Sequence, residues 1–217
     1  MSELVDYYKQ RAKEYEDVYY WTDPHRQEEQ RLMGETIKSS LRGRDVVDFA
    51  CGTGWWDRIL SETAKSIAGL DINEDVLEIA RSKEYGCPAK FQRGDAYDPP
   101  FTQPVFDGAI ATFWLSHIPK ARLHEWINTL HSVLKPGSRV FIAENTNIPG
   151  IGGPLVRKEG DENTYKLRTL KDGSQHTVMK NYYSACELVE IFGAHSHSFG
   201  PSNVYHGHCF YWVDYTV

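Results

Sequence analysis

The 217-residue chain is long enough for one globular domain, and 41% hydrophobic and 25% charged residues are typical of a packed core. Its formal net charge of −6 disfavours nucleic acid as a partner, because phosphate binding depends on clustered Lys and Arg. Its four cysteines lack CxxC spacing, and no segment has the apolar length of a signal peptide or membrane span. We therefore expect a cytoplasmic protein with no zinc ribbon, disulfide framework or membrane partner.

Two N-terminal helices are predicted ahead of an alternating pattern of strands and helices. The first runs from Leu4 to Tyr20, and the second opens at Asp23-Pro24, where Asp23 can cap the helix and Pro24 suits its first position. From Arg44 onward the alternation predicts a parallel sheet with helices on both faces. The elements expected are strand Asp45–Ala50, helix Trp55–Glu62, strand Ser66–Leu70, helix Glu74–Glu84, strand Ala89–Gln92, strand Phe106–Thr112, helix Ala121–Leu134, the turn Lys135-Pro136-Gly137 and strand Arg139–Glu144.

The pattern changes after Glu144. A loop rich in Gly and Pro covers 147–154, and two β-like segments then flank Asp172-Gly173, which is a hairpin signal. A helix over Ala185–Phe192 and strands over His195–Phe199 and His208–Tyr215 close the chain, with the last pair forming an antiparallel edge. The single domain thus divides into an N-terminal lid (1–43), a core (44–146), an insertion on the substrate side (147–183) and a closing part (184–217).

The segment 46–55, VVDFACGTGW, is an apolar strand that runs into a glycine turn and then a helix. In a doubly wound sheet such a turn lies at the carboxyl edge of the first strand, where ligands bind. Gly52 and Gly54 let the backbone approach a ligand, and the helix that follows presents free N–H groups. Asp71 ends the second strand and is placed to accept hydrogen bonds from ribose hydroxyls.

Three features separate this pattern from that of a nicotinamide-dependent oxidoreductase. Asp57 replaces the third fingerprint glycine, Asp48 precedes the glycines, and Gly94-Asp95-Ala96 follows the third strand. With Phe106-Asp107 and Leu134-Lys135-Pro136-Gly137-Ser138, these motifs resemble class I S-adenosylmethionine-dependent methyltransferases over nearly the whole chain. The resemblance implies a Rossmann-like doubly wound α/β fold of seven strands, the last antiparallel, with a helical cover and an inserted hairpin. The cofactor would be S-adenosylmethionine, bound by residues that include Asp48, Ala50, Gly52, Gly54, Trp55, Asp71, Ile72, Asp95, Ala96 and Phe113.

In this family the aspartate before the glycines orients the methionine end of the cofactor, and the later aspartate contacts the adenine amine, which implies these roles for Asp48 and Asp95. The first helix, 7–15 (YYKQRAKEY), also resembles the cover of small-molecule methyltransferases. Tyr8, Arg11 and Tyr15 share one face, so Arg11 can pair with the methionine carboxylate and the tyrosines can close over the sulfonium. The alternative is an amphipathic helix docked by its aromatic residues. Tyr19, Tyr20 and Trp21 are candidates for the lid of the pocket.

The segment 112–119, TFWLSHIP, ends the fourth strand and borders cofactor and substrate in this fold. His117 is a candidate general base, because an imidazole can take a proton at neutral pH. The alternative is that His117 braces the turn that follows. Trp114 is expected to supply an apolar wall of the substrate site.

Recognition of the methyl acceptor is expected in the hairpin 165–180, YKLRTLKDGSQHTVMK, which resembles the phosphonate O-methyltransferase of dehydrophos biosynthesis. That resemblance implies that Arg168 and Lys180 hold an anionic group. A two-residue turn pairs Arg168 with Thr177 and puts the two cations on opposite faces, whereas a three-residue loop with a bulge brings them to one face. The alternative is that both are solvated charges.

Two His-x-His pairs, His195/His197 and His206/His208, can point to one face of a strand, but no carboxylate or thiolate has the spacing of a partner, so no metal site is expected. The main prediction is O-methylation of a small anionic acid, either a phosphonate or a carboxylate. The alternatives are N- or O-methylation of a neutral metabolite, a nicotinamide-dependent oxidoreductase and a non-catalytic adenosyl-binding module. The oligomeric state, monomer or homodimer, is left open.

Overall fold

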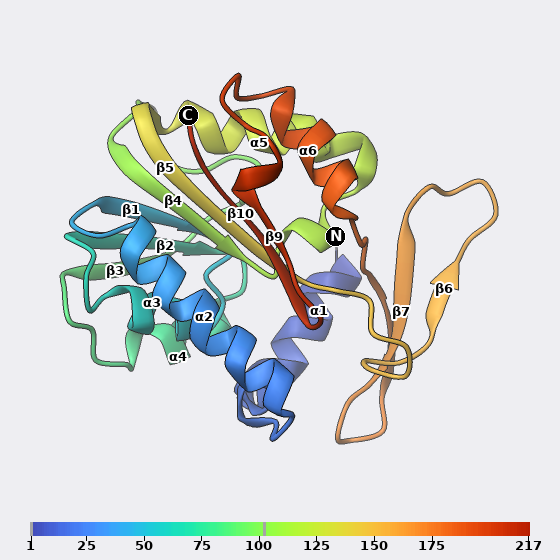
Figure 1. Cartoon of the computed structure of the whole chain (residues 1–217). Coiled ribbons are helices and arrows are strands. Elements are labelled where there is room, and N and C mark those ends of the chain that lie inside the picture. The colour runs from blue at the N-terminus through green and yellow to red at the C-terminus, as the bar shows by residue number, and fades with distance from the viewer. Residues whose placement is uncertain (1, 102) are drawn as a thin grey trace.

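A computed structural model describes residues 2–101 and 103–217 of the chain. At its centre lies one sheet in the order β3-β2-β1-β4-β5-β10-β9 (Figure 1). The strands from β3 to β5 in this order run parallel, whereas β10 pairs antiparallel with both neighbours. This is the Rossmann-like seven-stranded sheet that the sequence predicts. The strands are β1 (Asp45–Phe49), β2 (Ser66–Asp71), β3 (Ala89–Arg93), β4 (Phe106–Thr112), β5 (Leu134–Asn145), β9 (Val204–His206) and β10 (Phe210–Thr216).

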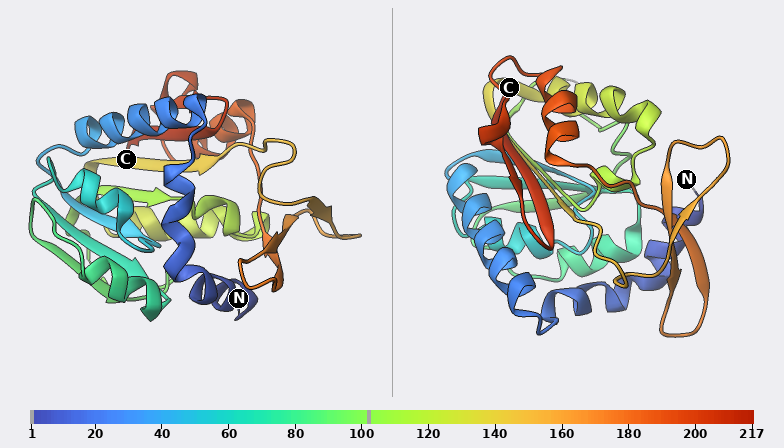
Figure 2. Two further views of the ribbon diagram at one scale, coloured as in Figure 1. Left: turned by 90° about the horizontal axis from the view of Figure 1, so that it is seen from below. Right: turned by 45° about the vertical axis from the view of Figure 1, so that its right-hand side comes forward.

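Helices cover both faces of the sheet, as Figures 1 and 2 show. Val46 packs in the core with Met33 and Ile37 of α2. Its neighbour Val47 packs on the opposite face, in the core that holds Trp126 of α5. Since successive residues of a strand point to opposite faces, β1 is buried on both sides, which explains its continuous apolar run. The helices are α2 (Pro24–Ser40) and α3 (Trp55–Leu60) on the first face, α5 (Leu123–Ser132) and α6 (Ala185–Gly193) on the second, and α4 (Glu74–Arg81) against β3.

The start of α2 confirms the predicted cap and is tied to the far end of the chain. The Asp23 carboxylate accepts a hydrogen bond from the Arg26 N–H at 2.7 Å, and Pro24 takes the first position. One turn further on, the Glu29 carboxylate accepts three hydrogen bonds from the backbone N–H groups of residues 208–210, at 2.7, 2.9 and 2.9 Å. These bonds anchor α2 to the turn between β9 and β10.

The prediction of one helix from Leu4 to Tyr20 is wrong in its second half. The α-helix α1 covers Ser2–Arg11, and the chain then winds more tightly as a 3₁₀ helix over Ala12–Tyr20. A 3₁₀ run of this length is uncommon and needs tertiary support. That support comes from Tyr19, which stacks on Trp55 at 4.6 Å between ring centroids and accepts a hydrogen bond from Trp56 Nε1 at 3.2 Å.

The inserted segment forms a second, separate sheet of β6 (Leu155–Arg157), β7 (Thr164–Thr169) and β8 (Gln175–Met179). It stands apart from the central sheet beside α1 (Figures 1 and 2). Tyr7 of α1 packs with Leu170 and Val178 of the hairpin in a small apolar cluster. The lid and the insertion therefore support each other.

The hairpin adopts the bulged register. Leu170 and Ser174 close a three-residue loop through a hydrogen bond of 3.0 Å, and Gly173 has the positive φ of 87° that this loop requires. Arg168 pairs with His176, and the Lys180 N–H donates to the Thr164 carbonyl at 2.8 Å. Thr164 and Arg168 lie four residues apart on β7, so Arg168 and Lys180 share a face.

Two further boundaries differ from the prediction. The residues 195–199 form turns and not a strand, because the His195 and Ser196 N–H groups bond back to the Phe192 carbonyl at the end of α6. The strand at this edge is β9 instead. The turn at 135–137 does not separate helix from strand, because β5 begins at Leu134 and contains it as an irregularity, with φ of 80° at Gly137.

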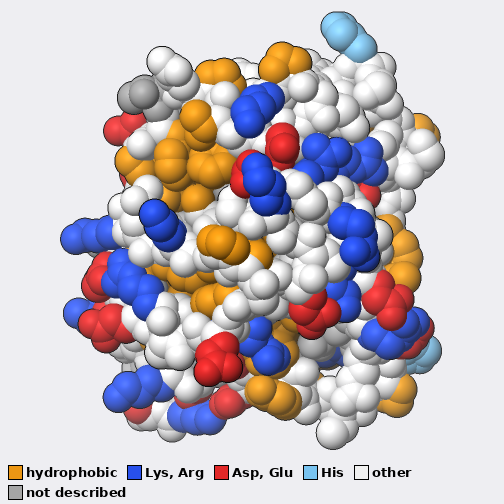
Figure 3. Space-filling view, turned by 90° about the vertical axis from the view of Figure 1, so that its left-hand side faces the viewer, with side chains coloured by type: hydrophobic (Ala, Val, Ile, Leu, Met, Phe, Trp, Pro, Cys, Tyr) orange, Lys and Arg blue, Asp and Glu red, His pale blue; other side chains and the backbone are white. Residues whose placement is uncertain are grey.

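Lys and Arg are interspersed with Asp and Glu over the face drawn in Figure 3, where no large patch of one sign appears. Ion pairs between side chains of opposite sign at the protein surface include Arg31 with Glu28 and Lys65 with Asp45. No helix in the described ranges is long and apolar enough to cross a bilayer. Within the same ranges, no three His, Cys, Asp or Glu side chains gather in a way that could hold a metal ion.

Candidate functional site

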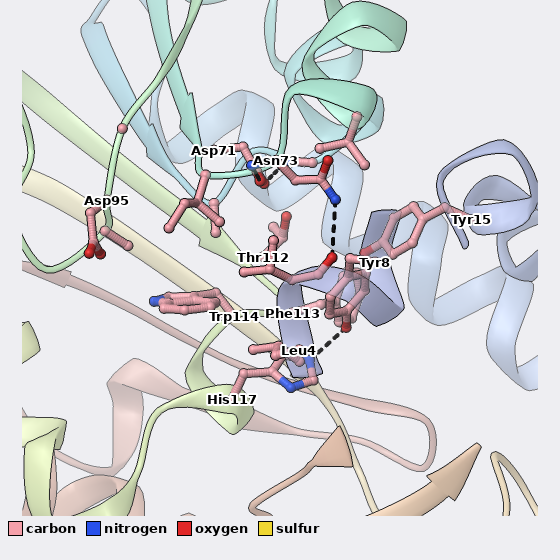
Figure 4. A pocket seen from close by; sticks show the side chains of 17 residues that line it. Leu4, Tyr8, Tyr15, Asp71, Asn73, Asp95, Thr112, Phe113, Trp114 and His117 are labelled. Carbon is pink, nitrogen blue, oxygen red and sulfur yellow. Dashed lines mark hydrogen bonds between the residues drawn. The ribbon is translucent and has the colours of Figure 1, made fainter. Parts of the chain in front are cut away.

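The carboxyl ends of the parallel strands border a cavity of about 800 Å³, here called the first cavity (Figure 4). Ala50 after β1 and Phe113 after β4 both line it, and both have left-handed backbone, with φ of 61° and 62°. Non-glycine residues rarely hold this conformation, and such strain gathers at functional sites. The predicted cofactor-binding residues that line this cavity are Tyr8, Tyr15, Ala50, Gly52, Asp71, Ile72, Asp95, Ala96 and Phe113.

Two carboxylates mark the wall formed by β2 and β3. Asp71 Oδ2 accepts a hydrogen bond from the Gly52 N–H at 3.0 Å, and Asp71 Oδ1 accepts one from the Asn73 N–H at 2.9 Å. Burial raises the pKa of Asp71, against the lowering effect of these N–H donors. Asp95 accepts from the Tyr97 N–H at 2.9 Å. Because a carboxylate offers about four lone-pair sites, both residues keep acceptor capacity for a ligand.

Asp48 does not line the first cavity but lies buried beneath the glycine turn, beside Asp57 of α3. No side chain outside the pair donates a hydrogen bond to either carboxyl group in the described part of the chain, and the two groups are close enough to share one. Burial, with the charge of Asp57, raises the pKa of Asp48 well above its ordinary value, and burial raises the pKa of Asp57 to about 7. Two buried neighbouring carboxylates do not both ionise, so the pair holds a proton near neutral pH.

Three other predicted residues line neither this cavity nor its neighbour described below. A Cβ at Gly54 would collide with the Tyr85 hydroxyl, so this glycine permits the close approach of the turn to α4. Trp55 stacks on Tyr19 under the lid. Tyr20 packs edge-on against Trp55 and is 66% exposed, and it lines neither cavity.

His117 joins three parts of the fold at the bottom of the first cavity. Its Nδ1 lies 2.7 Å from the Met179 carbonyl oxygen in β8, and its Nε2 lies 2.7 Å from the Tyr8 hydroxyl of α1 (Figure 4). A carbonyl only accepts, so Nδ1 carries the proton and Nε2 accepts from Tyr8. Burial, followed by the charge of Lys180, lowers the pKa of His117 well below its usual value. The imidazole is therefore neutral, and its lone pair is engaged by Tyr8.

A second cavity, of about 730 Å³, adjoins the first. Tyr8, Tyr15 and Phe113 line both, so they form the shared wall. Trp114 lines only the first cavity, where its buried Nε1 has no acceptor among the described residues. No acidic side chain of the described ranges lines the second cavity, whereas four cations do: Arg11, Arg26, Arg168 and Lys180.

Lys180 is held at this cavity by a buried ion pair. Its Nζ lies 2.8 Å from Glu144 Oε2, with the two side chains 5% and 0% exposed. Glu144 also accepts from Ser116 Oγ at 2.8 Å and from the Asn145 N–H at 3.0 Å. Burial lowers the pKa of Lys180, whereas Glu144 acts to raise it. The pair fixes the position of the lysine ammonium.

Arg11 and Arg168 also line this cavity, and neither has a carboxylate within ion-pair distance in the described chain. Arg11 donates to the Tyr7 hydroxyl at 3.0 Å and lies over the Tyr15 ring at 5.2 Å, and it lines the second cavity and not the first. Arg168 packs against the backbone of Gly152, where a Cβ would collide with the guanidinium. The hairpin and the loop before it thus present a free guanidinium to the cavity.

Two residues at the second cavity, Glu144 and Arg26, are not among those predicted from the sequence. The sequence did contain a signal for Glu144, because this residue ends a predicted strand at the carboxyl edge of the sheet, where ligands bind. The fold buries its side chain fully. The sequence contained no signal for Arg26, because an arginine in the first turn of a helix is ordinarily exposed.

A family model described as a methyltransferase domain matches residues 46–137. O-methyltransferase cnsE of Penicillium expansum is 35% identical over 205 residues, covering 82% of this chain and 73% of that protein. Demethylmenaquinone methyltransferase of Clavibacter sepedonicus is 32% identical over 122 residues, covering 56% and 48%. Two solved structures of DhpI, a complex with SAH and one with SAM and HEP, superpose with TM-scores of 0.76 and 0.77 at 25% identity. Each covers 98% of this chain, and this chain covers 94% and 95% of the two DhpI chains.

The similar proteins and the residues that line the first cavity indicate the same cofactor. Two left-handed residues, a glycine turn and the acceptors Asp71 and Asp95 surround apolar side chains, which suits an adenosyl group. The chain is therefore not a nicotinamide-dependent oxidoreductase, and its cofactor is S-adenosylmethionine. Its substrates are small molecules, as the O-methyltransferase relatives indicate. The chain belongs to the class I S-adenosylmethionine-dependent methyltransferases.

Proposed function

We propose that the protein methylates an oxygen of a small anionic acid, a phosphonate or a carboxylate, bound in the second cavity. The observation that carries this proposal is the cluster of Arg11, Arg168 and Lys180 beside the wall shared with the first cavity. Arg168 and Lys180 reach one face only in the bulged register of the hairpin. A bidentate guanidinium and a fixed ammonium suit a planar or tetrahedral oxyanion.

When bound, S-adenosylmethionine would supply a methyl group on its sulfonium. The acid oxygen would form the new C–O bond in line as the C–S bond breaks, and the sulfur would leave as the thioether of S-adenosylhomocysteine. Asp71 would hold the ribose hydroxyls, Asp95 the adenine amine, and the backbone at Gly52 the methionine end. Arg168 and Lys180 would orient the acid so that one oxygen faces the shared wall, and Tyr8 and Tyr15 would exclude water from it. An ionised oxygen already carries the attacking lone pair, so these residues act by position alone and no base is required.

The role of His117 follows from the same geometry. Because its Nε2 accepts from Tyr8 and its Nδ1 donates to Met179, His117 fixes α1 and β8 against the core. For an anionic acceptor we assign it this positioning role. A neutral hydroxyl acceptor is the second candidate, and the Tyr8 hydroxyl, which lines both cavities, then offers a path for the acceptor proton to Nε2 of His117.

Acceptor screening tests the proposal. Purified protein with S-adenosylmethionine is offered small phosphonic and carboxylic acids, each beside its neutral amide, and formation of S-adenosylhomocysteine is measured. The acids should react and the amides should not. Equal turnover of neutral analogues would refute an anionic acceptor and favour the second candidate.

Matched variants connect the activity with the cavity. Arg168→Gln should raise KM for the acid about 10- to 100-fold, the effect of one lost hydrogen bond to a charged group, and leave the affinity for S-adenosylhomocysteine unchanged. Lys171→Gln is the control, because this lysine lies in the hairpin loop, is 74% exposed and pairs with Asp17 at the surface. Equal KM values for the two variants would contradict the assignment.

A further inference from the structure

Arg26 is a buried cation without a carboxylate partner. It lies in the first turn of α2, is 7% exposed and lines the second cavity. Its guanidinium carbon is 5.2 Å from the Trp21 ring centroid and 4.6 Å from that of Phe210. Burial lowers the pKa of Arg26, but a guanidinium stays charged in proteins. The fold therefore keeps a positive charge inside the cavity.

The polar contacts of Arg26 leave two nitrogens unused. Its Nε donates to the Val18 carbonyl at 3.3 Å, and the described residues offer no acceptor to its Nη atoms. Two carboxylates lie near it, but both are engaged elsewhere: Asp23 caps α2, and Glu29 accepts the N–H groups of residues 208–210. Buried charges are normally paired, so an unpaired guanidinium that faces a cavity indicates a ligand.

Arg26 is also separate from Lys180. It stacks on Phe210 of β10, which pairs with Asn145 and belongs to the core beneath α2. Lys180 binds Glu144, whose strand partner Tyr211 belongs to the core on the opposite face. Phe210 and Tyr211 are neighbours on β10, so they point to opposite faces of the sheet. Arg26 and Lys180 therefore lie on opposite sides of the sheet where β5 pairs with β10. The second cavity spans both.

We propose that Arg26 is a second anion subsite and that the acceptor is a diacid, with one acid group at Arg168 and Lys180 and a carboxylate at Arg26. This inference rests on the proposed function. Four cations line the cavity and Glu144 offsets one of them, so a dianion matches the site better than a monoanion. Tyr19 and Trp21, which line the same cavity, would flank the carbon chain between the two groups.

The test compares acids of equal length that differ in one group. Alkylphosphonates are measured against ω-carboxyalkylphosphonates, and monocarboxylates against α,ω-dicarboxylates, over a series of chain lengths with S-adenosylmethionine present. One chain length should give the diacid a kcat/KM about 10- to 100-fold above its monoacid, the effect of one hydrogen bond to a charged group. Arg26→Gln should abolish this advantage by lowering kcat/KM for the diacid more than for its monoacid, and Arg26→Lys should restore part of it.

Arg31→Gln is the control, because Arg31 lies on the exposed face of α2 and is 54% exposed. It should behave as the wild-type protein does. The inference is overturned if no diacid exceeds its monoacid, or if the advantage persists in Arg26→Gln. It is also overturned if Arg26→Gln weakens monoacids and S-adenosylhomocysteine binding equally, since that identifies a purely structural arginine. If no acid of either series is methylated, the proposed function fails and this inference fails with it.

Discussion

Replacing Lys180 with methionine removes the cation of a buried ion pair and leaves Glu144 charged in the interior. The two side chains are 5% and 0% exposed, and their charged atoms are 2.8 Å apart. Breaking such a pair from one side costs about 3–5 kcal/mol. Because Glu144 keeps its hydrogen bonds from Ser116 and Asn145, we expect the lower end, about 3 kcal/mol. For a protein of this size that corresponds to a fall in Tm of about 6–12 °C.

Urea unfolding followed by far-ultraviolet circular dichroism measures this cost. The double variant Lys180→Met/Glu144→Gln should recover most of the lost stability, because no uncompensated charge remains. Lys171→Met serves as the control, since its pair with Asp17 is exposed and contributes less than about 1 kcal/mol. A loss below about 1 kcal/mol in Lys180→Met, or no recovery in the double variant, would refute the view that Glu144 and Lys180 form a desolvated pair.

Three other predictions concern the first cavity and the buried carboxyl pair beneath its glycine turn. Asp71→Asn should weaken S-adenosylhomocysteine binding about 10- to 100-fold in calorimetric titration, because it removes a charged acceptor; an unchanged Kd would exclude Asp71 from the site. His117→Asn should lose less stability than the wild-type protein as the pH falls below about 6.5, since the folded state keeps His117 neutral while the unfolded chain takes up a proton. Parallel stability curves would show that the imidazole is not shielded. For Asp57 the pH dependence of stability has the opposite sign. Its folded pKa is raised to about 7, so its contribution to stability is present at low pH and is lost as the pH rises through 7. Asp57→Asn should therefore gain stability relative to wild type between pH 5 and 8. Equal slopes would contradict a shared proton.

Much of the core was predictable from local signals. The apolar run of β1, the glycine turn after it and Asp71 at the end of β2 follow one another at fixed spacing. They therefore predicted the edge of the sheet that borders the first cavity. The cap at Asp23 is equally local, since it depends on a side chain and an N–H three residues apart. Such features depend on neighbouring residues alone and can be predicted without knowledge of the rest of the fold.

Other features depended on contacts between distant segments. The tight winding after Arg11 is supported by Tyr19 packing on Trp55, which is far away in the chain. The turns at 195–199 replaced a predicted strand, because the end of α6 takes their N–H groups. No spacing along the chain reveals that Glu144 meets Lys180 or that Arg26 stacks on Phe210.

The amino-acid sequence by itself predicted the doubly wound sheet from its alternating strands and helices, and the order of its motifs along the chain predicted the family and the cofactor by resemblance. Only the tertiary structure decided the second cavity. Whether Arg168 and Lys180 share a face depends on one residue of register in the hairpin loop, and the sequence allowed both registers. The packing of Tyr7 against Leu170 and Val178, and the bond from His117 to Met179, belong to the register that is found. Register in a short hairpin is settled by what its faces contact, and those contacts come from segments far away in the chain.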